Sequence, residues 1–352
     1  MFLKSLNLQN FRSYKKVEFT FNFNTTFVIG PNTSGKTNLV EAICLLSSGK
    51  SFRADKDFQM IGFDSEMARV NGETTDTKLE VIVTSGQING TNVPFKKYLV
   101  NGVSRRRVDF SSNLNMVIFS PEDLDIIIDS PSLRRRFLDD ILEQVDRDYR
   151  IALITYTKGL RQRNALLEIA KETGARQEKQ FEYWDNVLIK NGQEIAKKRE
   201  EFIEYVNLQN KDIFDFAVVY DKSVISKERL LKYKEAELGS GVTLVGPHRD
   251  DFLVEMFDNL RQTTHNVRFF GSRGQQRLII LQLKLLELAF VEEKLGHRPI
   301  FVLDDIFSEL DEEHIKLVLE MINLQQTIIT TTHEEFIPKK LLDKVQVIEL
   351  TK

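Results

Sequence analysis

The chain has 352 residues, of which 41% are hydrophobic and 29% charged, an ordinary composition for a globular protein. Its formal net charge of −3 gives no indication of nucleic-acid binding, so any basic surface must be local. The single cysteine, Cys44, excludes an internal disulfide and favours a reducing compartment. Because no signal peptide and no apolar run near the ~20 residues of a membrane span is present, we expect a cytoplasmic protein without a membrane partner.

The first 130 residues alternate between strand-like and turn-like segments around one helix. Apolar residues recur at every second position from Val17 to Phe23, which predicts a strand with one buried face. A short apolar segment at 26–29 predicts another strand, and the stretch from Lys36 has helical periodicity. Short β-like segments between about 65 and 120 are separated by turn signals, which favours an antiparallel sheet.

The pattern changes at Ser130-Pro131, a helix N-cap residue followed by a proline at the first helical position. Apolar residues at helical spacing then predict three helices, with a gap near Gly174, and strand-like sequence returns from about Phe214. We therefore expect an α/β protein with two domains. A discontinuous head would comprise residues 1–130 and 211–352, and residues 131–210 would form an inserted helical lobe.

A phosphate-binding pattern, G-x-x-x-x-G-K-[ST], occupies the segment between a predicted strand and a predicted helix. In such a loop the backbone N–H groups surround phosphates, and the helix N-terminus adds the positive end of its dipole. Lys36 is expected to reach the β- and γ-phosphates of ATP, and Thr37 to ligate Mg²⁺. The predicted nucleotide-binding residues here are Gly30, Pro31, Asn32, Thr33, Ser34, Gly35, Lys36 and Thr37.

A second apolar segment, 300–303, ends in two carboxylates, as a Walker B strand does. Asp304 is expected to hold Mg²⁺ directly or through water, and Asp305 to polarise the attacking water. The alternative is a strand that ends in a polar turn. His333 follows another apolar segment, where P-loop ATPases often place a catalytic residue that senses the γ-phosphate; a histidine that merely caps a strand is an equal alternative. No zinc site is expected, because no other histidine has metal-ligand spacing.

The segment Ser272–Gln275 precedes a strongly apolar helix and matches the S-x-G-Q core of the ABC ATPase signature. Serine and glycine at a helix N-terminus can donate to a γ-phosphate held by another subunit. The predicted nucleotide-binding set therefore also includes Ser272, Gly274 and Gln275; the alternative is an ordinary N-cap on a core helix. Residues Ser308–Asp311 resemble the D-loop of the same superfamily.

Nearly the whole chain resembles the RecF family of DNA replication and repair ATPases. The segments that go beyond general ABC features are Phe119–Leu124, Arg134–Asp139 and Gly246–Asp251. Leu8–Arg12, Gly49–Arg53 and Gln162–Leu167 add to them. The resemblance implies an ABC-type P-loop ATPase head related to SMC proteins, with a mixed central sheet, an antiparallel β subdomain and a short helical lobe instead of a long coiled coil.

The resemblance also implies how such a protein works. Two ATP molecules with Mg²⁺ would be held in a transient homodimer, each between one P-loop and the partner's Ser272 segment. The dimer would bind duplex or gapped DNA without sequence specificity, and slow, DNA-stimulated ATP hydrolysis would release it. RecR and RecO would be its partner proteins in loading recombinase. Thr33 departs from the family pattern, since glycine is usual there, and Phe270-Gly271 stand where transporters commonly have leucine.

Basic clusters in two regions are candidate phosphate contacts. The predicted DNA-binding residues are Arg105, Arg106, Arg107, Arg134, Lys158 and Arg161. The alternative for each cluster is a solvated charged face, and pairing of Arg135 and Arg136 with carboxylates of the head stays open.

The main alternative function is the ATPase subunit of an ABC transporter. Against it, most of the chain, including the whole helical lobe, separates the P-loop at Gly30 from the signature at Ser272. A long-armed SMC-type tether would need heptads over hundreds of residues, for which the insert has no room. A nuclease would need a further domain or a metal-binding carboxylate cluster, and the sequence offers neither.

Overall fold

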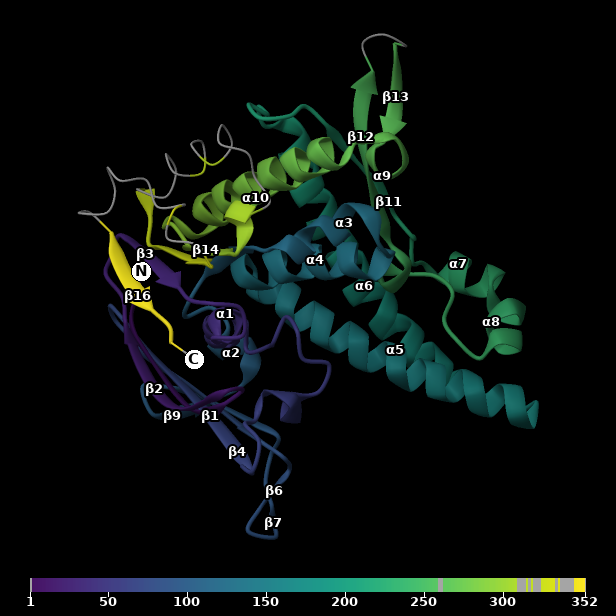
Figure 1. The fold of residues 1–352 in the computed structure, drawn as a ribbon. Helices are drawn as coiled ribbons and strands as arrows, with labels where there is room; N and C mark the ends of the chain where they lie inside the picture. The colour runs from purple at the N-terminus through teal and green to yellow at the C-terminus, as the bar shows by residue number, and fades with distance from the viewer. Residues whose placement is uncertain are drawn as a thin grey trace. The chain divides into compact units, whose positions relative to one another are not determined.

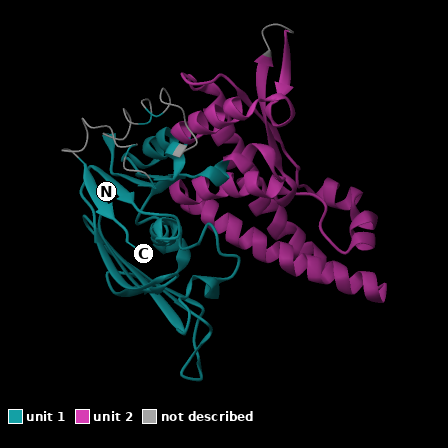
Figure 2. Ribbon diagram, in the orientation of Figure 1, with its two compact units in different colours: residues 1–123, 287–352 teal, residues 124–286 magenta. Residues whose placement is uncertain are grey.

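The computed structural model describes residues 2–258, 262–308, 315, 318, 324–332, 335 and 345–351. The chain packs as two compact units, Met1–Asp123 with Glu287–Lys352, and Leu124–Leu286 (Figure 2). No helix within the described ranges is both long enough and apolar enough to cross a membrane.

Unit 1 contains a five-stranded sheet, in which the strand that precedes the P-loop has a neighbouring strand on each side (Figure 1). Every pairing among its described strands is parallel, so the carboxyl ends of all five strands lie at one edge. In spatial order the strands are β10 (Met116–Phe119), β14 (Ile300–Asp304), β15 (Thr327–Thr331), β3 (Thr25–Ile29) and β16 (Gln346–Glu349).

The second sheet of unit 1 is antiparallel throughout and also includes the first two strands of the chain. The expected antiparallel sheet is found for residues 67–105, whereas the last strand of the predicted range, β10, pairs parallel with β14 in the other sheet. Its strands are, in spatial order, β2 (Tyr14–Thr20), β1 (Leu3–Phe11), β4 (Met67–Thr74), β5 (Lys78–Thr84), β8 (Lys96–Val100) and β9 (Val103–Arg105). A separate small hairpin joins β6 (Gln87–Ile88) and β7 (Thr91–Asn92).

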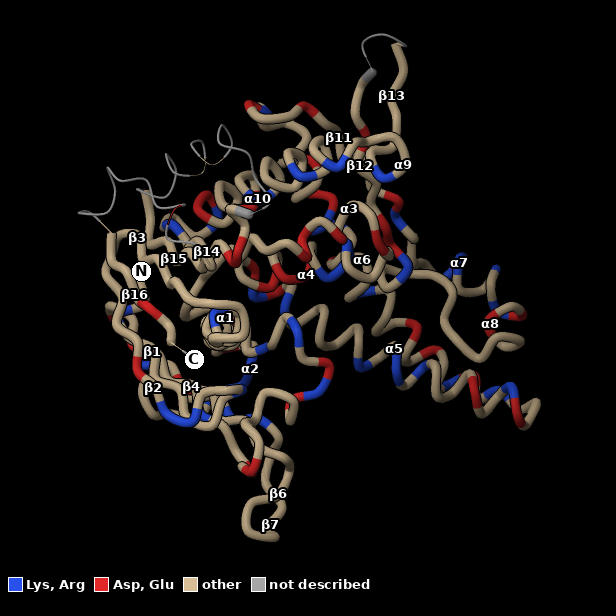
Figure 3. The backbone as a smooth tube through the Cα atoms, viewed as in Figure 1, with Lys and Arg blue, Asp and Glu red and all other residues tan. Residues whose placement is uncertain are grey.

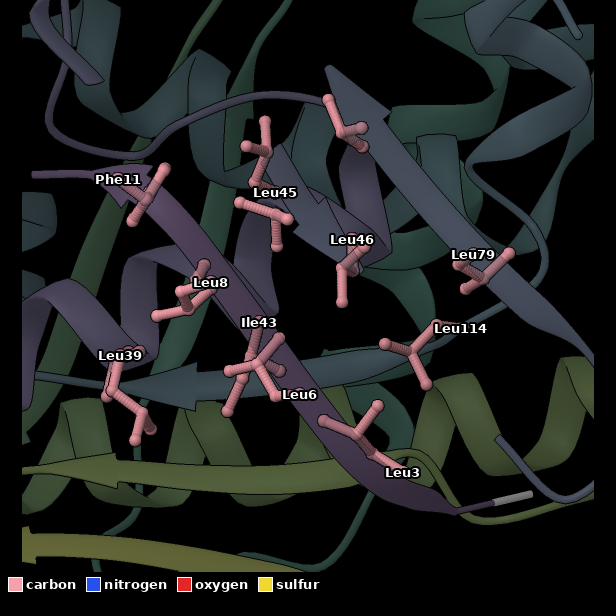
Figure 4. Packing of buried hydrophobic residues seen from close by; sticks show 14 of the residues in the cluster. Leu3, Leu6, Leu8, Phe11, Leu39, Ile43, Leu45, Leu46, Leu79 and Leu114 are labelled. Atoms are coloured by element: carbon pink, nitrogen blue, oxygen red, sulfur yellow. The ribbon is translucent and has the colours of Figure 1, made fainter. Parts of the chain in front are cut away.

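Helix α1 (Lys36–Ser48) contacts both sheets, and the main core of unit 1 forms around it. Leu39, Ile43, Leu45 and Leu46 pack against the β1 side chains of Leu3, Leu6 and Leu8 (Figure 4). Because the helix is covered on more than one side, its buried positions extend beyond the single stripe that the sequence predicted. This burial fixes the helix whose first turn carries the phosphate-binding motif.

Unit 2 combines long helices with a three-stranded antiparallel sheet. The three predicted helices are confirmed as α4 (Pro131–Val145), α5 (Arg147–Thr173) and α6 (Glu178–Leu208), and Gly174 ends α5 in a left-handed conformation. The sheet has the order β11 (Ala217–Asp221), β12 (Asp251–Asp258) and β13 (Thr263–Asn266). The remaining helices of this unit are α3 (Asp125–Ile128), α7 (Lys227–Lys232), α8 (Lys234–Ser240), α9 (Val267–Phe270) and the first part of α10 (Arg273–Leu295).

Residues 211–286 pack with the helices in unit 2, whereas the sequence pattern predicted that they belong to the head. The reason is local contact: β11 lies against α6, and β12 lies against α4. Strand periodicity alone carries no information about which helices a strand will cover, so this part of the division could only be read from the structure.

Candidate nucleotide-binding site

The P-loop connects β3 to α1, in the strand–loop–helix context that the motif requires. The Lys36 ammonium donates to the carbonyl oxygens of Gly30 and Pro31, at 2.7 and 3.1 Å, so it lies against the concave side of its own loop. Gly35 has a φ of +103°, and a Cβ there would lie 2.6 Å from the Tyr14 hydroxyl oxygen. That hydroxyl donates to the Gly35 carbonyl at 3.1 Å, and burial raises the pKa of Tyr14 to about 12. Only glycine fits this turn.

Thr33 adopts the left-handed backbone region, with a φ of +73°. Glycine enters that region freely, whereas an L-residue loses about 1–2 kcal/mol and a β-branched side chain is a genuine outlier. The substitution noted in the sequence therefore leaves the glycine-like path of the loop intact and stores local strain in it.

The two Walker B carboxylates lie at the carboxyl edge of the parallel sheet, which is where open α/β sheets bind ligands. Asp304 is buried, with 4% of its surface exposed. It accepts a hydrogen bond from the Thr330 hydroxyl at 2.5 Å and another from Thr37. Burial raises the pKa of Asp304 despite these two hydrogen bonds, and nearby Glu122 and Asp305 act in the same direction.

Asp305 follows in the left-handed backbone region, with a φ of +53°. Its backbone N–H donates to the carbonyl and hydroxyl oxygens of Thr330, at 3.1 and 3.0 Å. Burial lowers the pKa of Lys36, while Asp305 and Asp304 oppose this effect. The structure thus gathers Lys36, Thr37, Asp304 and Asp305 in one place, as the sequence analysis expected of them. Thr330 was not foreseen, because an interior strand threonine has no distinguishing pattern.

A second set of polar side chains forms hydrogen bonds to α1. The Glu41 carboxylate is completely buried and accepts both Arg12 donors, at 2.7 and 2.6 Å, and the Ser51 hydroxyl at 2.5 Å. Asn38, one residue after Thr37, donates to Ser13 at 2.9 Å. Arg12 and Ser51 belong to segments that carried the family resemblance, and the sequence assigned them no role. Here they hold the first two turns of the P-loop helix.

The signature segment begins α10 with a reciprocal capping box. Gln275 N–H donates to the Ser272 hydroxyl oxygen at 3.2 Å, and Ser272 N–H donates to the Gln275 side-chain oxygen at 2.8 Å. The N-cap interpretation is therefore correct, and it is compatible with phosphate binding. The hydroxyl oxygen acts as an acceptor within the helix end, which leaves its proton for an external acceptor. Ser272 and Gly274 are exposed.

Two other predicted elements lie outside the described residues. They are His333, and the D-loop at residues 309–311 together with the side chain of Ser308. Their roles stay predictions.

The predicted DNA contacts differ in accessibility. Arg105 and Arg106 are exposed, although Arg106 pairs with Asp109 at 3.1 Å, and Arg107 is half-buried and donates to the Ser48 carbonyl at 3.3 Å. Lys158 and Arg161 are exposed on α5, where basic residues recur along the helix (Figure 3).

Arg134 was predicted to contact DNA, and its burial corrects that prediction. Only 3% of its side chain is exposed, and its guanidinium binds Asp251 through two bonds of 2.6 and 3.0 Å and the Asp129 carbonyl at 2.8 Å. A group so enclosed has no donor facing solvent for a DNA phosphate, so Arg134 is a structural residue of unit 2. The neighbouring Arg135 likewise donates to the Asp250 carbonyl at 2.8 Å.

Two more buried arginines form ion pairs in unit 2, and these pairs give the family-specific segments a structural role. Arg199 bridges Asp139 and Asp250, at 2.8 and 3.0 Å. Arg163 bridges Asp185 and Glu237, at 2.6 and 2.7 Å, with 1% of its side chain exposed. The segments Arg134–Asp139 and Gly246–Asp251 are therefore partners in one ionic network that joins α4, α6 and the start of β12.

Comparison with known proteins finds relatives that match nearly the whole chain. The family model described as RecF/RecN/SMC N terminal domain matches residues 2–351. The DNA replication and repair protein RecF of Moorella thermoacetica is 35% identical over 364 residues, covering 99% of this chain and 95% of that protein. The RecF protein of an Exiguobacterium species is 36% identical over 373 residues, covering 99% and 97%.

Solved structures lead to the same family. One described as the recombination mediator protein RecF-ATPrS in the RecFOR pathway has a TM-score of 0.84 and 32% identity, covering 96% of this chain and 94% of that chain. The Smc head domain of Pyrococcus furiosus, with a TM-score of 0.51 and 18% identity, shares the fold. The expected ABC-type α/β head is thereby confirmed, and the chain belongs to the RecF family of DNA replication and repair proteins.

Proposed function

We propose that this protein is an ATP-dependent DNA-binding protein of recombinational repair and replication restart, and a weak ATPase. The observation that carries the proposal is the meeting of Lys36, Thr37, Asp304 and Asp305 at the carboxyl edge of the parallel sheet. The P-loop supplies cationic and backbone donors for the triphosphate. The relative described as RecF-ATPrS supports nucleotide binding by this fold.

Mg²⁺ fits the oxygen-only donor set of Thr37 and Asp304, which already share a hydrogen bond. When bound, the ion would neutralise charge on the β- and γ-phosphates. Lys36 would exchange its bonds to Gly30 and Pro31 for bonds to phosphate oxygens. Asp305, held at its backbone by Thr330, would orient and polarise the attacking water.

The proposed functional unit is an ATP-dependent homodimer. Ser272, whose hydroxyl proton is not used by its own capping box, would donate to the γ-phosphate bound by the second copy. Exposed Arg105, Arg106, Lys158 and Arg161 would contact DNA phosphates, without reading bases. RecR and RecO are the partner proteins that we expect from the RecFOR pathway named for the related structure. Membership of the RecF family leaves no observation that favours the transporter alternative.

The test is ATP hydrolysis with and without duplex and gapped DNA, at several salt concentrations. We expect DNA to stimulate hydrolysis, and this stimulation should decline as the salt concentration rises. The logarithm of the DNA-binding constant should fall with the logarithm of the salt concentration, with a slope of roughly 0.9 for each phosphate contact. Lys36→Ala should lose ATP binding. Asp305→Asn should bind ATP and DNA but hydrolyse slowly, and Ser272→Arg should bind ATP without dimerising. Hydrolysis that no DNA changes, across the whole salt series, would contradict the DNA-dependent part of the proposal.

A further inference from the structure

Two large aromatic side chains project from the turn directly before the signature serine. Phe269 and Phe270, in α9, are 72% and 60% exposed. Arg268 lies over the Phe269 ring at 5.5 Å, and the His265 ring is 5.1 Å from that of Phe270. These contacts leave most of both phenylalanine rings in solvent, which is unfavourable for apolar surface unless a partner covers it.

The turn that carries the two rings is held firmly. Val267 is completely buried, and its carbonyl accepts Gly271 N–H at 2.9 Å and the buried Gln276 amide at 3.2 Å. The Asn266 side chain caps α9 by accepting Arg268 N–H at 2.9 Å. A Cβ on Gly271 would lie 2.7 Å from the Val267 carbonyl oxygen, so glycine permits this tight return. The exposed rings are therefore presented in a preorganised position, two and three residues before Ser272.

The segment that carries these rings has no acidic residue of its own. Residues 262–286 contain no aspartate or glutamate, and Arg268 and Arg273 are exposed beside the aromatic pair and the signature serine. The face that would bind nucleotide carries the opposite charge, namely a triphosphate together with Asp304, Asp305 and the nearby Glu122. A cationic and aromatic surface thus complements the nucleotide-bound face of another copy.

We propose that Phe269 and Phe270 are the apolar anchors with which one copy of this protein packs onto the nucleotide-bound face of a second copy. This inference rests on the proposed ATP-dependent homodimer, and it adds a specific surface to it. Each anchor would be used twice in a two-fold symmetric dimer, so its loss counts twice. Buried aromatic side chains are frequent hot spots of interfaces, and Ser272 lies immediately beside them.

The experiment measures dimerisation by sedimentation velocity, with Mg²⁺ and the slowly hydrolysed analogue ATPγS. The double variant Phe269→Ala/Phe270→Ala should weaken the dimer by at least about 100-fold, because two hot spots are lost on each side. The matched control is Phe63→Ala, a fully exposed phenylalanine in unit 1, which should change dimerisation by no more than about twofold. Phe269→Leu/Phe270→Leu keeps most of the apolar area and should restore much of the dimer.

Binding of a fluorescent ATP analogue to the monomer separates this surface from the nucleotide site, and the double alanine variant should bind it as the unaltered protein does. Dimerisation of that variant at the unaltered affinity would overturn the inference alone. Failure of the unaltered protein to dimerise with ATPγS would overturn the proposed homodimer and the inference together. A variant that dimerises normally but loses affinity for single-stranded DNA would assign the rings to base stacking and also overturn the inference.

Discussion

His248 offers the sharpest test of the packing in unit 2. Its Nε2 lies 3.0 Å from the Thr243 carbonyl oxygen, which can only accept, so Nε2 carries the proton. Its Nδ1 lies 2.8 Å from the Tyr156 hydroxyl and therefore accepts. This arrangement suits a neutral imidazole. Burial lowers the pKa of His248 from 6.5 to about 4, and the nearby cations Arg249, Arg135 and Arg163 act in the same direction.

The lowered pKa makes stability depend on pH with a definite sign. Between about pH 4 and pH 6.5 the unfolded chain binds a proton at this histidine and the folded protein does not, so stability rises with pH. The stabilisation is fully present above pH 6.5 and is lost as the pH falls toward 4. By linkage, the free energy of unfolding should decrease by about 2 kcal/mol from this residue alone between pH 7 and pH 5.

The perturbation is His248→Gln, since the glutamine amide can donate to Thr243 and accept from Tyr156 without titrating. Urea unfolding of both proteins at pH 7 and pH 5 measures the effect, and all other titrating groups cancel in the difference between them. The variant should gain about 2 kcal/mol relative to the unaltered protein on acidification. Parallel pH profiles of the two proteins would refute the argument, as would an NMR titration in which the His248 ring protonates near pH 6.5.

Three further predictions concern the P-loop, the Walker B strand and the buried ionic network. Thr33→Asn should stabilise the protein by about 0.5–1 kcal/mol in urea unfolding, because asparagine tolerates the positive φ; no gain would mean that the loop is unstrained. The raised pKa of Asp304 means that stability is lost as the pH rises above the ordinary aspartate value, so Asp304→Asn should raise the melting temperature at pH 7 while weakening Mg²⁺-dependent ATP binding. A lower melting temperature would contradict this sign. Arg163→Leu should cost about 3–5 kcal/mol of unfolding free energy by leaving two carboxylates unpaired, and adding Glu237→Gln should recover part of it. A loss below about 1 kcal/mol would show that water compensates these charges.

The sequence alone determined the features that are encoded within a few neighbouring residues. The P-loop needs glycines and a lysine at set positions between a strand and a helix, and the structure has that order. The helices of 131–210 follow from apolar periodicity, and the second of them ends where Gly174 permits a left-handed turn. The Walker B carboxylates were identifiable because an apolar strand ends in both of them.

Tertiary structure decided the features that depend on contacts between distant segments. Arg134 was indistinguishable in sequence from a solvated cation, and it is structural because Asp251, 117 residues away, lies against it. The Thr330 hydroxyl reaches Asp304 only because β14 and β15 are parallel neighbours. The strands of residues 211–286 belong to the helical unit because they pack against its helices, and packing is not encoded in strand periodicity. Local patterns specify the backbone of one segment, whereas the charge state and partners of a side chain are set by which other segments bury it.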